Sequence, residues 1–254
     1  MALPSALPQR RHLRLVTAAL AATAVLAAPA GQPARAELQA QVTQTPGVDV
    51  SNFQGAVNFR RVKASGRAFA IVLATDGTSF TSPDFRSQYR GAKAAGLIRG
   101  AYHFARPGRS SAASQANRFL DVVGGTRDGV TLPPVVDLEF NPNGSACYGL
   151  SARQTVAWVK AFLARVKART GRNAIIYTGP GYWNQCAAGS RAFSASHPLW
   201  TADYGVSRPH RYGGWSVYTI WQYTSSGSVP GISGRVDLDR FNGSRTRLRA
   251  LAKS

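Results

Sequence analysis

The 254-residue sequence predicts an α/β protein folded as a compact, incomplete barrel of parallel strands. Short apolar runs alternate with amphipathic segments across residues 47–243, a pattern typical of parallel strands with helices packed outside them. Eight such runs occur in this stretch, which is too short for a full eightfold β/α repeat. No repeat or Pro/Ser-rich linker interrupts it, so we expect one domain.

The first 36 residues predict an export signal. Arg10, Arg11 and Arg14 precede an apolar stretch, 15–28, that is short and Ala-rich for a membrane span. Residues 34–36 (ARA) offer an A-x-A cleavage site, and residues 28–30 (APA) offer a second. A retained membrane anchor is the alternative. We therefore expect a secreted protein with a signal peptide at 1–36, a lead-in at 37–46, a catalytic domain at 47–245 and a C-terminal tail at 246–254.

The expected strands and helices alternate at first, and helices become scarce after the sixth strand. Helices are expected at 84–95, 111–123 and 151–170, with a helical turn at 181–186. The helix at 151–170 is the clearest, because Ser151 can cap its start and Gly171 can end it. Strands are expected at 48–50, 68–74, 100–104, 134–138, 174–178, 198–202, 219–223 and 236–238.

The few acidic residues gather near the ends of these strands. The chain has 11 acids against 31 basic residues, and six of the acids lie at or near predicted strand ends. In a β/α barrel the carboxyl ends of the strands surround one mouth, where active sites are built. We therefore expect these six acids to converge at one rim: Asp49, Asp76, Asp137, Glu139, Asp203 and Asp237.

Asp137 and Glu139 form the most informative pair. Side chains two residues apart on a strand point the same way, with Cα atoms about 6.6 Å apart. Two carboxylates so placed repel each other, so one tends to keep its proton at neutral pH. A protonated acid beside an ionised one is what cleavage of a glycosidic bond requires. The alternative is a structural Asp followed by a helix-capping Glu.

Aromatic residues on the same strands indicate a sugar ligand. Flat rings stack on the apolar faces of sugars, and Gln, Asn and Tyr side chains bond hydroxyl groups. Each ring could equally belong to the core, because a strand points alternate side chains to opposite faces. The aromatic residues concerned are Tyr102, Phe104, Tyr177, Trp200, Trp221 and Tyr223.

Cys147 and Cys186 are the only cysteines, and both lie in loop-like sequence. An even count in an exported protein predicts one disulfide. We expect no metal site and no cofactor, because the chain has no C-x-x-C and its four histidines do not cluster in sequence.

The charge favours an anionic partner. Removing residues 1–36, which hold four arginines and no acid, would leave 27 basic and 11 acidic residues and a net charge of +16. For an exported protein the natural polyanion is an acidic cell wall; an arginine-rich composition with no role is the alternative. The basic residues are scattered, so we expect no nucleic-acid partner, and no membrane partner once the signal is removed.

Eight motifs occur in an order that resembles glycoside hydrolase family 25, the Chalaropsis-type lysozymes or N-acetylmuramidases. They are GVDVS with FQG (47–55), ATDG (74–77), AYHFARP (101–107), LPPVVDLE (132–139), IIYTG (175–179), LW (199–200), WQY (221–223), and VDL with FNG (236–243). The resemblance implies a flattened TIM-like barrel of five β/α units plus three strands. It also implies cleavage of the β-1,4 bond between N-acetylmuramic acid and N-acetylglucosamine in peptidoglycan.

The resemblance assigns roles by position. Glu139 would be the general acid, and Asp137 would orient the 2-acetamido group of the substrate or stabilise the charge that develops near it. Asp49 and Asp237 would complete the acidic ring. Tyr102 would line the subsite beside them, and we expect further substrate contacts from Asp76, Tyr177, Trp221 and Asp203.

The chain departs from the family at residues 73–77. The family often has K-A-T-E-G where this chain has L-A-T-D-G. Because strand alternation points Leu73 and Asp76 to opposite sides, we expect Leu73 to pack outside the barrel. The shorter acid at Asp76 would alter subsite binding or reduce activity.

A D-x-E pair acting on an N-acetylated sugar fits substrate assistance, in which the acetamido oxygen attacks the anomeric carbon. Two other functions are consistent with the sequence: a chitinase-like hydrolase, and a non-catalytic wall-binding protein on the same fold. We expect a monomer that acts on bacterial peptidoglycan.

Overall fold

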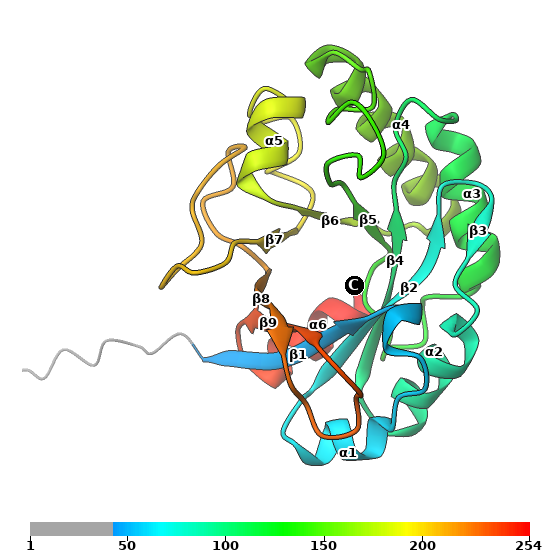
Figure 1. The fold of residues 1–254 in the computed structure, drawn as a ribbon, viewed down its shortest axis with the longest axis vertical. Coiled ribbons are helices and arrows are strands. Elements are labelled where there is room, and N and C mark those ends of the chain that lie inside the picture. The colour runs from blue at the N-terminus through cyan, green and yellow to red at the C-terminus, as the bar shows by residue number, and fades with distance from the viewer. Residues whose placement is uncertain (1–42) are drawn as a thin grey trace, which may run out of the picture. The chain divides into compact units, whose positions relative to one another are not determined.

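The computed structural model describes residues 43–254, so the predicted signal peptide and most of the lead-in lie outside the described residues. In Figure 1 the strands surround a common centre, α1 to α5 lie outside them, and α6 lies behind. The strands are β1 (Gln44–Val50), β2 (Phe69–Asp76), β3 (Phe80–Thr81), β4 (Ile98–Phe104), β5 (Val135–Asp137), β6 (Ile175–Thr178), β7 (Leu199–Ala202), β8 (Ile220–Gly227) and β9 (Val236–Asn242). The helices are η1 (Asn52–Gln54), α1 (Phe59–Ala64), α2 (Phe85–Ala94), α3 (Ala112–Val123), α4 (Ala152–Thr170), α5 (Pro180–Cys186) and α6 (Arg245–Lys253).

Pairing of β1 with two neighbours closes the sheet into a barrel. The strand order is β1-β9-β8-β7-β6-β5-β4-β2, and β1 also pairs with β2. All neighbours in this ring run parallel except those of β9, which is antiparallel to both β8 and β1. Five β/α units are followed by three strands that have no helix between them. The predicted fold class is therefore confirmed.

Strand alternation divides the core into two layers. On β2, Phe69 and Ile71 belong to the cluster inside the barrel, whereas Ala70 and Val72 pack with the outer helices. Large side chains such as Trp200 and Ile220 fill the interior below the mouth. Burying each large apolar side chain contributes roughly 1.5–3 kcal/mol to the free energy of folding. The lower half of the barrel is therefore a stable, packed core beneath the mouth.

Helix α6 closes the base of the barrel, in the segment that the sequence predicts as a tail. Ser244 caps its start by accepting a hydrogen bond from the Arg247 N–H. Leu248 and Ala252 are each 1% exposed and pack in the inner cluster. The buried Arg172 guanidinium donates to the carbonyls of Leu251 (2.8 Å) and Ala252 (3.2 Å). These contacts dock the helix onto the barrel.

The N-terminal strand is longer than predicted. β1 begins at Gln44, and Thr45 Oγ1 donates to the Gly243 carbonyl at 2.7 Å. Part of the expected lead-in therefore belongs to the barrel. No helix within residues 43–254 combines the length and the apolar character that crossing a membrane requires.

The predicted disulfide between Cys147 and Cys186 is confirmed. It joins the loop that follows β5 to the last residue of α5, with the two Cα atoms 5.3 Å apart. In the same region the Phe140 ring packs edge-on against Tyr182, at 5.5 Å between centroids. The bond therefore restrains the loop that immediately follows Glu139.

Replacing both cysteines by serine should lower the free energy of unfolding by about 2–4 kcal/mol, because the bond closes a loop spanning 39 residues. Guanidinium unfolding of the double variant measures the effect. The exposed Ser145→Ala change in the same loop is the control. Equal midpoints and slopes for wild type and double variant would contradict the prediction.

Candidate active site

A cavity of about 670 Å³ opens at the mouth of the barrel and collects most of the predicted acids. Asp49 of β1, Asp76 of β2, and Asp137 and Glu139 at the end of β5 all line it, together with Asp237 of β9. A broader surface hollow of about 970 Å³, between α1 and residues 228–233, has no acid in its lining. The mouth is therefore where carboxyl chemistry is concentrated.

Asp237 reaches the mouth by a different route from the one predicted. The sequence places it near the C-terminal end of an expected strand, but it is the second residue of β9. Because β9 runs antiparallel to β1, its N-terminal end lies at the mouth. In this register Asp237 is directly opposite Asp49, so the first and last strands each contribute a carboxyl group to one side of the cavity.

The acids differ in exposure. Asp49 and Asp137 are each 4% exposed, whereas Glu139 and Asp237 are half-buried and open to the cavity. Burial raises the pKa of Asp137 well above its usual value, and the neighbouring charge of Glu139 raises it further. Burial also raises the pKa of Glu139, partly offset by hydrogen bonds with Asp137 and Tyr177. The two groups therefore titrate as a coupled pair that keeps a proton to higher pH than two separate, exposed carboxyl groups would.

Gln222 of β8 positions Asp49. Its Nε2 donates to Asp49 Oδ2 at 2.8 Å, and its Oε1 accepts from the hydroxyls of Tyr177, at 2.8 Å, and Tyr204. This chain of bonds fixes the Gln222 amide and the Asp49 carboxyl. In the W-Q-Y motif the aromatic residues were expected to bind sugar, but it is the Gln222 amide that links β8 to β1 and β6.

Asp239 is an acid whose place the sequence analysis missed. It lies two residues beyond Asp237 on β9, is 1% exposed, and accepts a hydrogen bond from Trp200 Nε1 at 2.8 Å. Burial raises the pKa of Asp49, and Asp239 and Asp237 raise it further, in that order. The D-L-D pattern at 237–239 was the available signal, since both acids of such a pair face the same side of a strand.

Asp76 lines the cavity but is already paired. Arg106 binds it with two hydrogen bonds, Nε to Oδ1 and Nη2 to Oδ2, each of 2.6 Å. The Arg106 guanidinium also lies over the Phe104 ring, 4.5 Å from its centroid. Arg106 therefore neutralises this acid and fixes one wall of the cavity, a role that the sequence did not reveal.

Leu73 corrects an expectation. Alternation counted back from an inward Asp76 predicts that it faces outward, yet it lines the same cavity, in phase with the inward Phe69 and Ile71. The pairing of β2 with β4 shifts register between Leu73 and Thr75. Such an irregularity interrupts strand alternation, so residues three apart both reach the mouth. An apolar side chain therefore stands on the cavity wall where the family often has lysine.

The predicted substrate-binding residues divide into two groups. Tyr102 and Tyr177 line the cavity, with Trp200 beneath them at centroid distances of 6.3 and 4.6 Å. Trp221 and Asp203 do not line it, contrary to expectation. Trp221 alternates with the inward Gln222 and donates to the Asp203 carbonyl at 2.8 Å. The Asp203 carboxylate instead accepts from His210, both from the backbone N–H and at Nδ1.

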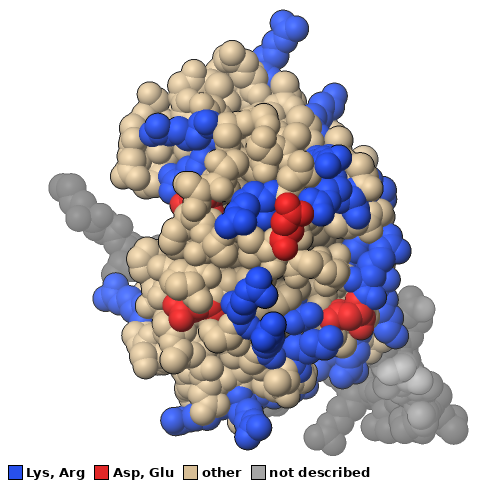
Figure 2. All heavy atoms as spheres, turned by 90° about the vertical axis from the view of Figure 1, so that its right-hand side faces the viewer, with Lys and Arg blue, Asp and Glu red and all other residues tan. Residues whose placement is uncertain are grey.

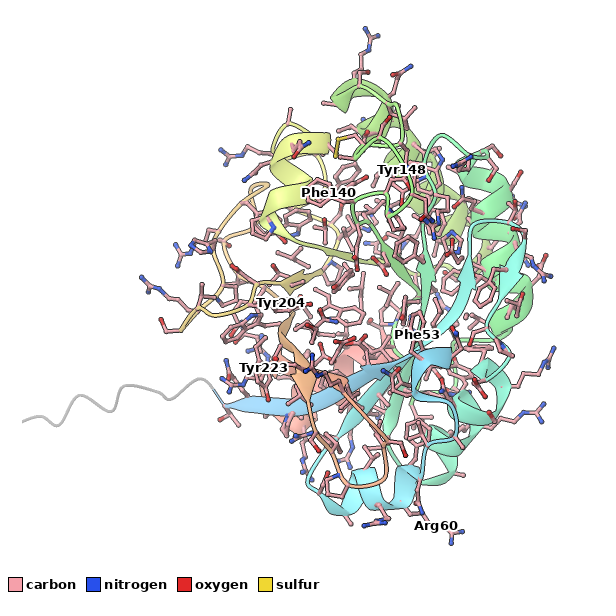
Figure 3. The ribbon with its side chains drawn as sticks, in the orientation of Figure 1. Phe53, Arg60, Phe140, Tyr148, Tyr204 and Tyr223 are labelled. Carbon is pink, nitrogen blue, oxygen red and sulfur yellow. A yellow bond between two sulfur atoms is a disulfide. The ribbon has the colours of Figure 1, made fainter. Side chains whose placement is uncertain are left out.

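Exposed aromatic residues surround the opening, and the sequence did not predict this role because they lie outside the strands that it predicts. Figure 3 shows Phe53, Phe140 and Tyr204 on separate segments around the mouth. Their exposed fractions are 89%, 41% and 46%, and Phe80 at 39% also lines the cavity. An aromatic rim thus surrounds an acidic interior, an arrangement suited to a sugar chain.

Phe53 is rigidly mounted despite its exposure. It lies in η1, where Ser51 and Gln54 form a capping box: each side chain accepts a hydrogen bond from the backbone N–H of the other residue. The buried Gln88 amide donates to the carbonyls of Ser51 and Gly55, both at 2.8 Å. These bonds fix the backbone that presents the Phe53 ring to solvent.

Comparison with known proteins agrees with this geometry. The profile of Glycosyl hydrolases family 25 matches residues 48–232. Lysozyme M1 of Streptomyces globisporus is 46% identical over 226 residues, covering 89% of this chain and 77% of that protein. The N,O-diacetylmuramidase of Chalaropsis sp is 45% identical over 200 residues, covering 75% of this chain and 95% of that protein.

A solved structure supports the same assignment. The bacterial lysozyme from Streptomyces coelicolor superposes with a TM-score of 0.81 at 46% identity, covering 83% of this chain and 98% of that one. The family match extends over most of the barrel and includes Asp49, Asp137 and Glu139. The chain therefore belongs to glycoside hydrolase family 25 and is a glycoside hydrolase.

Proposed function

We propose that this enzyme hydrolyses peptidoglycan, cutting the β-1,4 bond between N-acetylmuramic acid and N-acetylglucosamine outside the cell that makes it. The observation that carries the proposal is Glu139, a half-buried acid with a raised pKa that faces the cavity beside the buried Asp137. The relatives named lysozyme and N,O-diacetylmuramidase support this choice of substrate.

Glu139 is the general acid in this proposal. Its proton passes to the glycosidic oxygen as the bond from that oxygen to the anomeric carbon breaks, and the leaving sugar departs as an alcohol. A raised pKa lets Glu139 keep this proton to higher pH than an ordinary glutamate. The resulting carboxylate then takes a proton from the water that completes hydrolysis.

Asp137 orients the nucleophile, which we infer to be the acetamido oxygen of the substrate. Asp137 lines the cavity beside Glu139, so its carboxyl group can accept a hydrogen bond from the acetamido N–H of a bound sugar. Attack by the acetamido oxygen on the anomeric carbon forms a cyclic intermediate as the leaving group departs. Water opens this ring, and the product keeps the original anomeric configuration.

The carboxyl oxygens of Asp49 and Asp237 supply an electrostatic field from the opposite wall. Positive charge develops on the sugar ring as the glycosidic bond breaks. Carboxyl groups held in place beforehand stabilise that charge without reorganising. Gln222, by fixing Asp49, helps to hold this field in place.

The surface charge supports attraction to an anionic wall. Figure 2 shows Lys and Arg spread over the face that carries α2 and α3, with few acids among them. A net charge of +16, expected for residues 37–254, steers a protein toward polyanions over distances set by the ionic strength. We infer that the exported enzyme is concentrated at its substrate in this way.

Glu139→Gln should lower turnover on purified peptidoglycan by roughly 10²–10⁴-fold, because the isosteric amide cannot donate the proton. Reducing ends released by wild type and variant measure this, with chitin oligomers as the competing substrate.

Mass spectrometry should find muramic acid at the new reducing end, and proton NMR should find the β-anomer first. Faster cleavage of chitin, or equal rates for the two proteins, would refute the proposed function, and an initial α-anomer would exclude substrate assistance.

Asp239→Asn should stabilise the enzyme at neutral pH. Burial raises the folded-state pKa of Asp239. The stability that this acid contributes is therefore complete below its unfolded pKa of about 3.9 and is lost as pH rises through the folded value. Asparagine can still accept the Trp200 bond without carrying charge. The variant should melt at higher temperature than wild type near pH 8, and this gain should vanish near pH 3.5. Asp84→Asn, outside the cavity, is the control, and a gain that persists in acid would show that ionisation of Asp239 is not its cause.

Phe53→Ala should weaken binding of long glycan chains. An exposed ring on a fixed backbone at the rim can stack on a sugar remote from the cleaved bond, worth about 0.5–1.5 kcal/mol. KM for polymeric glycan should rise about two- to tenfold with kcat little changed, while a minimal oligosaccharide should be cleaved as before. Val217→Ala removes a side chain that is 66% exposed outside the cavity lining and is the control. An equal loss on short and long substrates would place Phe53 next to the cleaved bond instead.

A further inference from the structure

A second hollow lies at the base of the barrel, away from the mouth. It has a volume of about 260 Å³ and lies where β2 and β4 begin, against α6. Its floor is apolar and includes Ala68, Ile98 and Leu248. Since β2 spans eight residues, the base lies roughly 25 Å from the mouth. The cations on its rim are Lys63, Lys93, Arg245 and Arg249.

Three of these cations have no acid to neutralise them. Lys93 is bound by Asp128 at 2.8 Å. Lys63, Arg245 and Arg249 form no ion pair with any acid in residues 43–254. Lys63 Nζ donates only to the Gly96 carbonyl, at 2.7 Å, and Arg245 to the Gly66 carbonyl, at 3.1 Å. Burial lowers the pKa of Lys63, and the charges of Arg245 and Arg249 lower it further. An anion between these groups would relieve their repulsion.

The start of α6 adds to the unbalanced charge. Its first turn has no acid and includes Arg245. A helix N-terminus carries partial positive charge, so cations there are unfavourable and anions are favoured. An arginine in the first turn of a helix is therefore unfavourable for stability, as is expected where a residue serves binding instead. The helix end and the three side chains therefore favour the same kind of ligand.

The shape of the hollow defines that ligand further. A free inorganic anion would contact the cationic rim and leave the apolar floor uncovered. A phosphate ester carries its charge beside a carbon chain that can lie on the floor, and arginine binds phosphate oxygens through two donors at once. A membrane surface is disfavoured, because the large exposed apolar residues of the described chain do not line this hollow.

We propose that the base hollow binds a phosphodiester group of a polyol-phosphate polymer in the bacterial wall. This rests on the proposed function only in assuming that the enzyme works at a wall. The site would hold the enzyme on an anionic polymer while the cavity at the other end of the barrel remains open to glycan.

The test compares two charge-matched double variants of the mature protein. Arg245→Gln with Arg249→Gln removes two rim cations. Arg208→Gln with Arg211→Gln removes two exposed arginines from the loop after β7, whose side chains bond nothing within the described chain. Binding of poly(glycerol phosphate) is measured by calorimetry at fixed ionic strength, alongside inorganic phosphate and phosphatidylglycerol vesicles. Thermal unfolding verifies that each variant is folded, and Arg249→Gln alone serves as a second variant because the Arg249 side chain bonds no described residue.

We expect the base variant to bind the polymer about tenfold or more weakly than wild type. The control should lose less than about threefold, as general screening of two surface charges predicts. Inorganic phosphate should compete weakly at the wild-type site. Equal losses in the two double variants, or a base-dependent preference for vesicles over polymer, would overturn the proposal. Cleavage of polymer-free glycan by the base variant should equal that of wild type, so loss of the binding site and failure of the proposed hydrolysis are distinguishable.

Discussion

Closure of the barrel by β1 is the constraint on which the active site depends. β1 bonds β2 along one edge and β9 along the other, so strands nearly two hundred residues apart in sequence become neighbours. That register sets Asp49 opposite Asp237 and Gly47 opposite Asp239. Without it the carboxyl groups of β1 and β9 would not share a cavity with Asp137. Helix α6, tied to the barrel by Arg172, and the inner aromatic cluster support this closure from below.

The carboxyl cluster opposes the stability of the fold that holds it. Burial raises the pKa of Asp49, Asp137 and Asp239, so ionising any of them inside the barrel is unfavourable. Perturbed groups of this kind gather at functional sites, where chemistry needs them and the rest of the structure compensates. In this enzyme the compensation comes from a solid inner core and from the Cys147–Cys186 bond, which restrains the loop after Glu139. A less acidic mouth would make a more stable protein and a weaker acid catalyst.

Strand alternation and capping signals were sufficient to predict the eight barrel strands and the helices α2 to α5, including the one that begins after Ser151, because these depend on local sequence. The short helix α1 and the two-residue strand β3 were not predicted. What could not be predicted depends on pairing. The irregularity in β2 brought Asp76 to the same side as the inward Leu73, and the antiparallel course of β9 set which end of that strand reaches the mouth. On β8, Gln222 faces the cavity and Trp221 faces away from it. The local sequence does not indicate which of two neighbouring strand residues faces inward. Arg-rich sequence concealed α6, whose buried face contains only Leu248 and Ala252.

The separation of charge along the barrel explains how a strongly basic protein can keep an acidic cavity working. Cations placed near Glu139 would lower its pKa and release the proton too early, yet the rim of the base hollow lies roughly 25 Å away. This is more than twice the screening length of about 10 Å at 0.1 M salt. Arg106 is the one cation among the described residues that line the cavity, and its two bonds to Asp76 offset its charge locally. The cations of the base hollow and the carboxyl groups of the mouth therefore lie too far apart for either set to shift the charge state of the other.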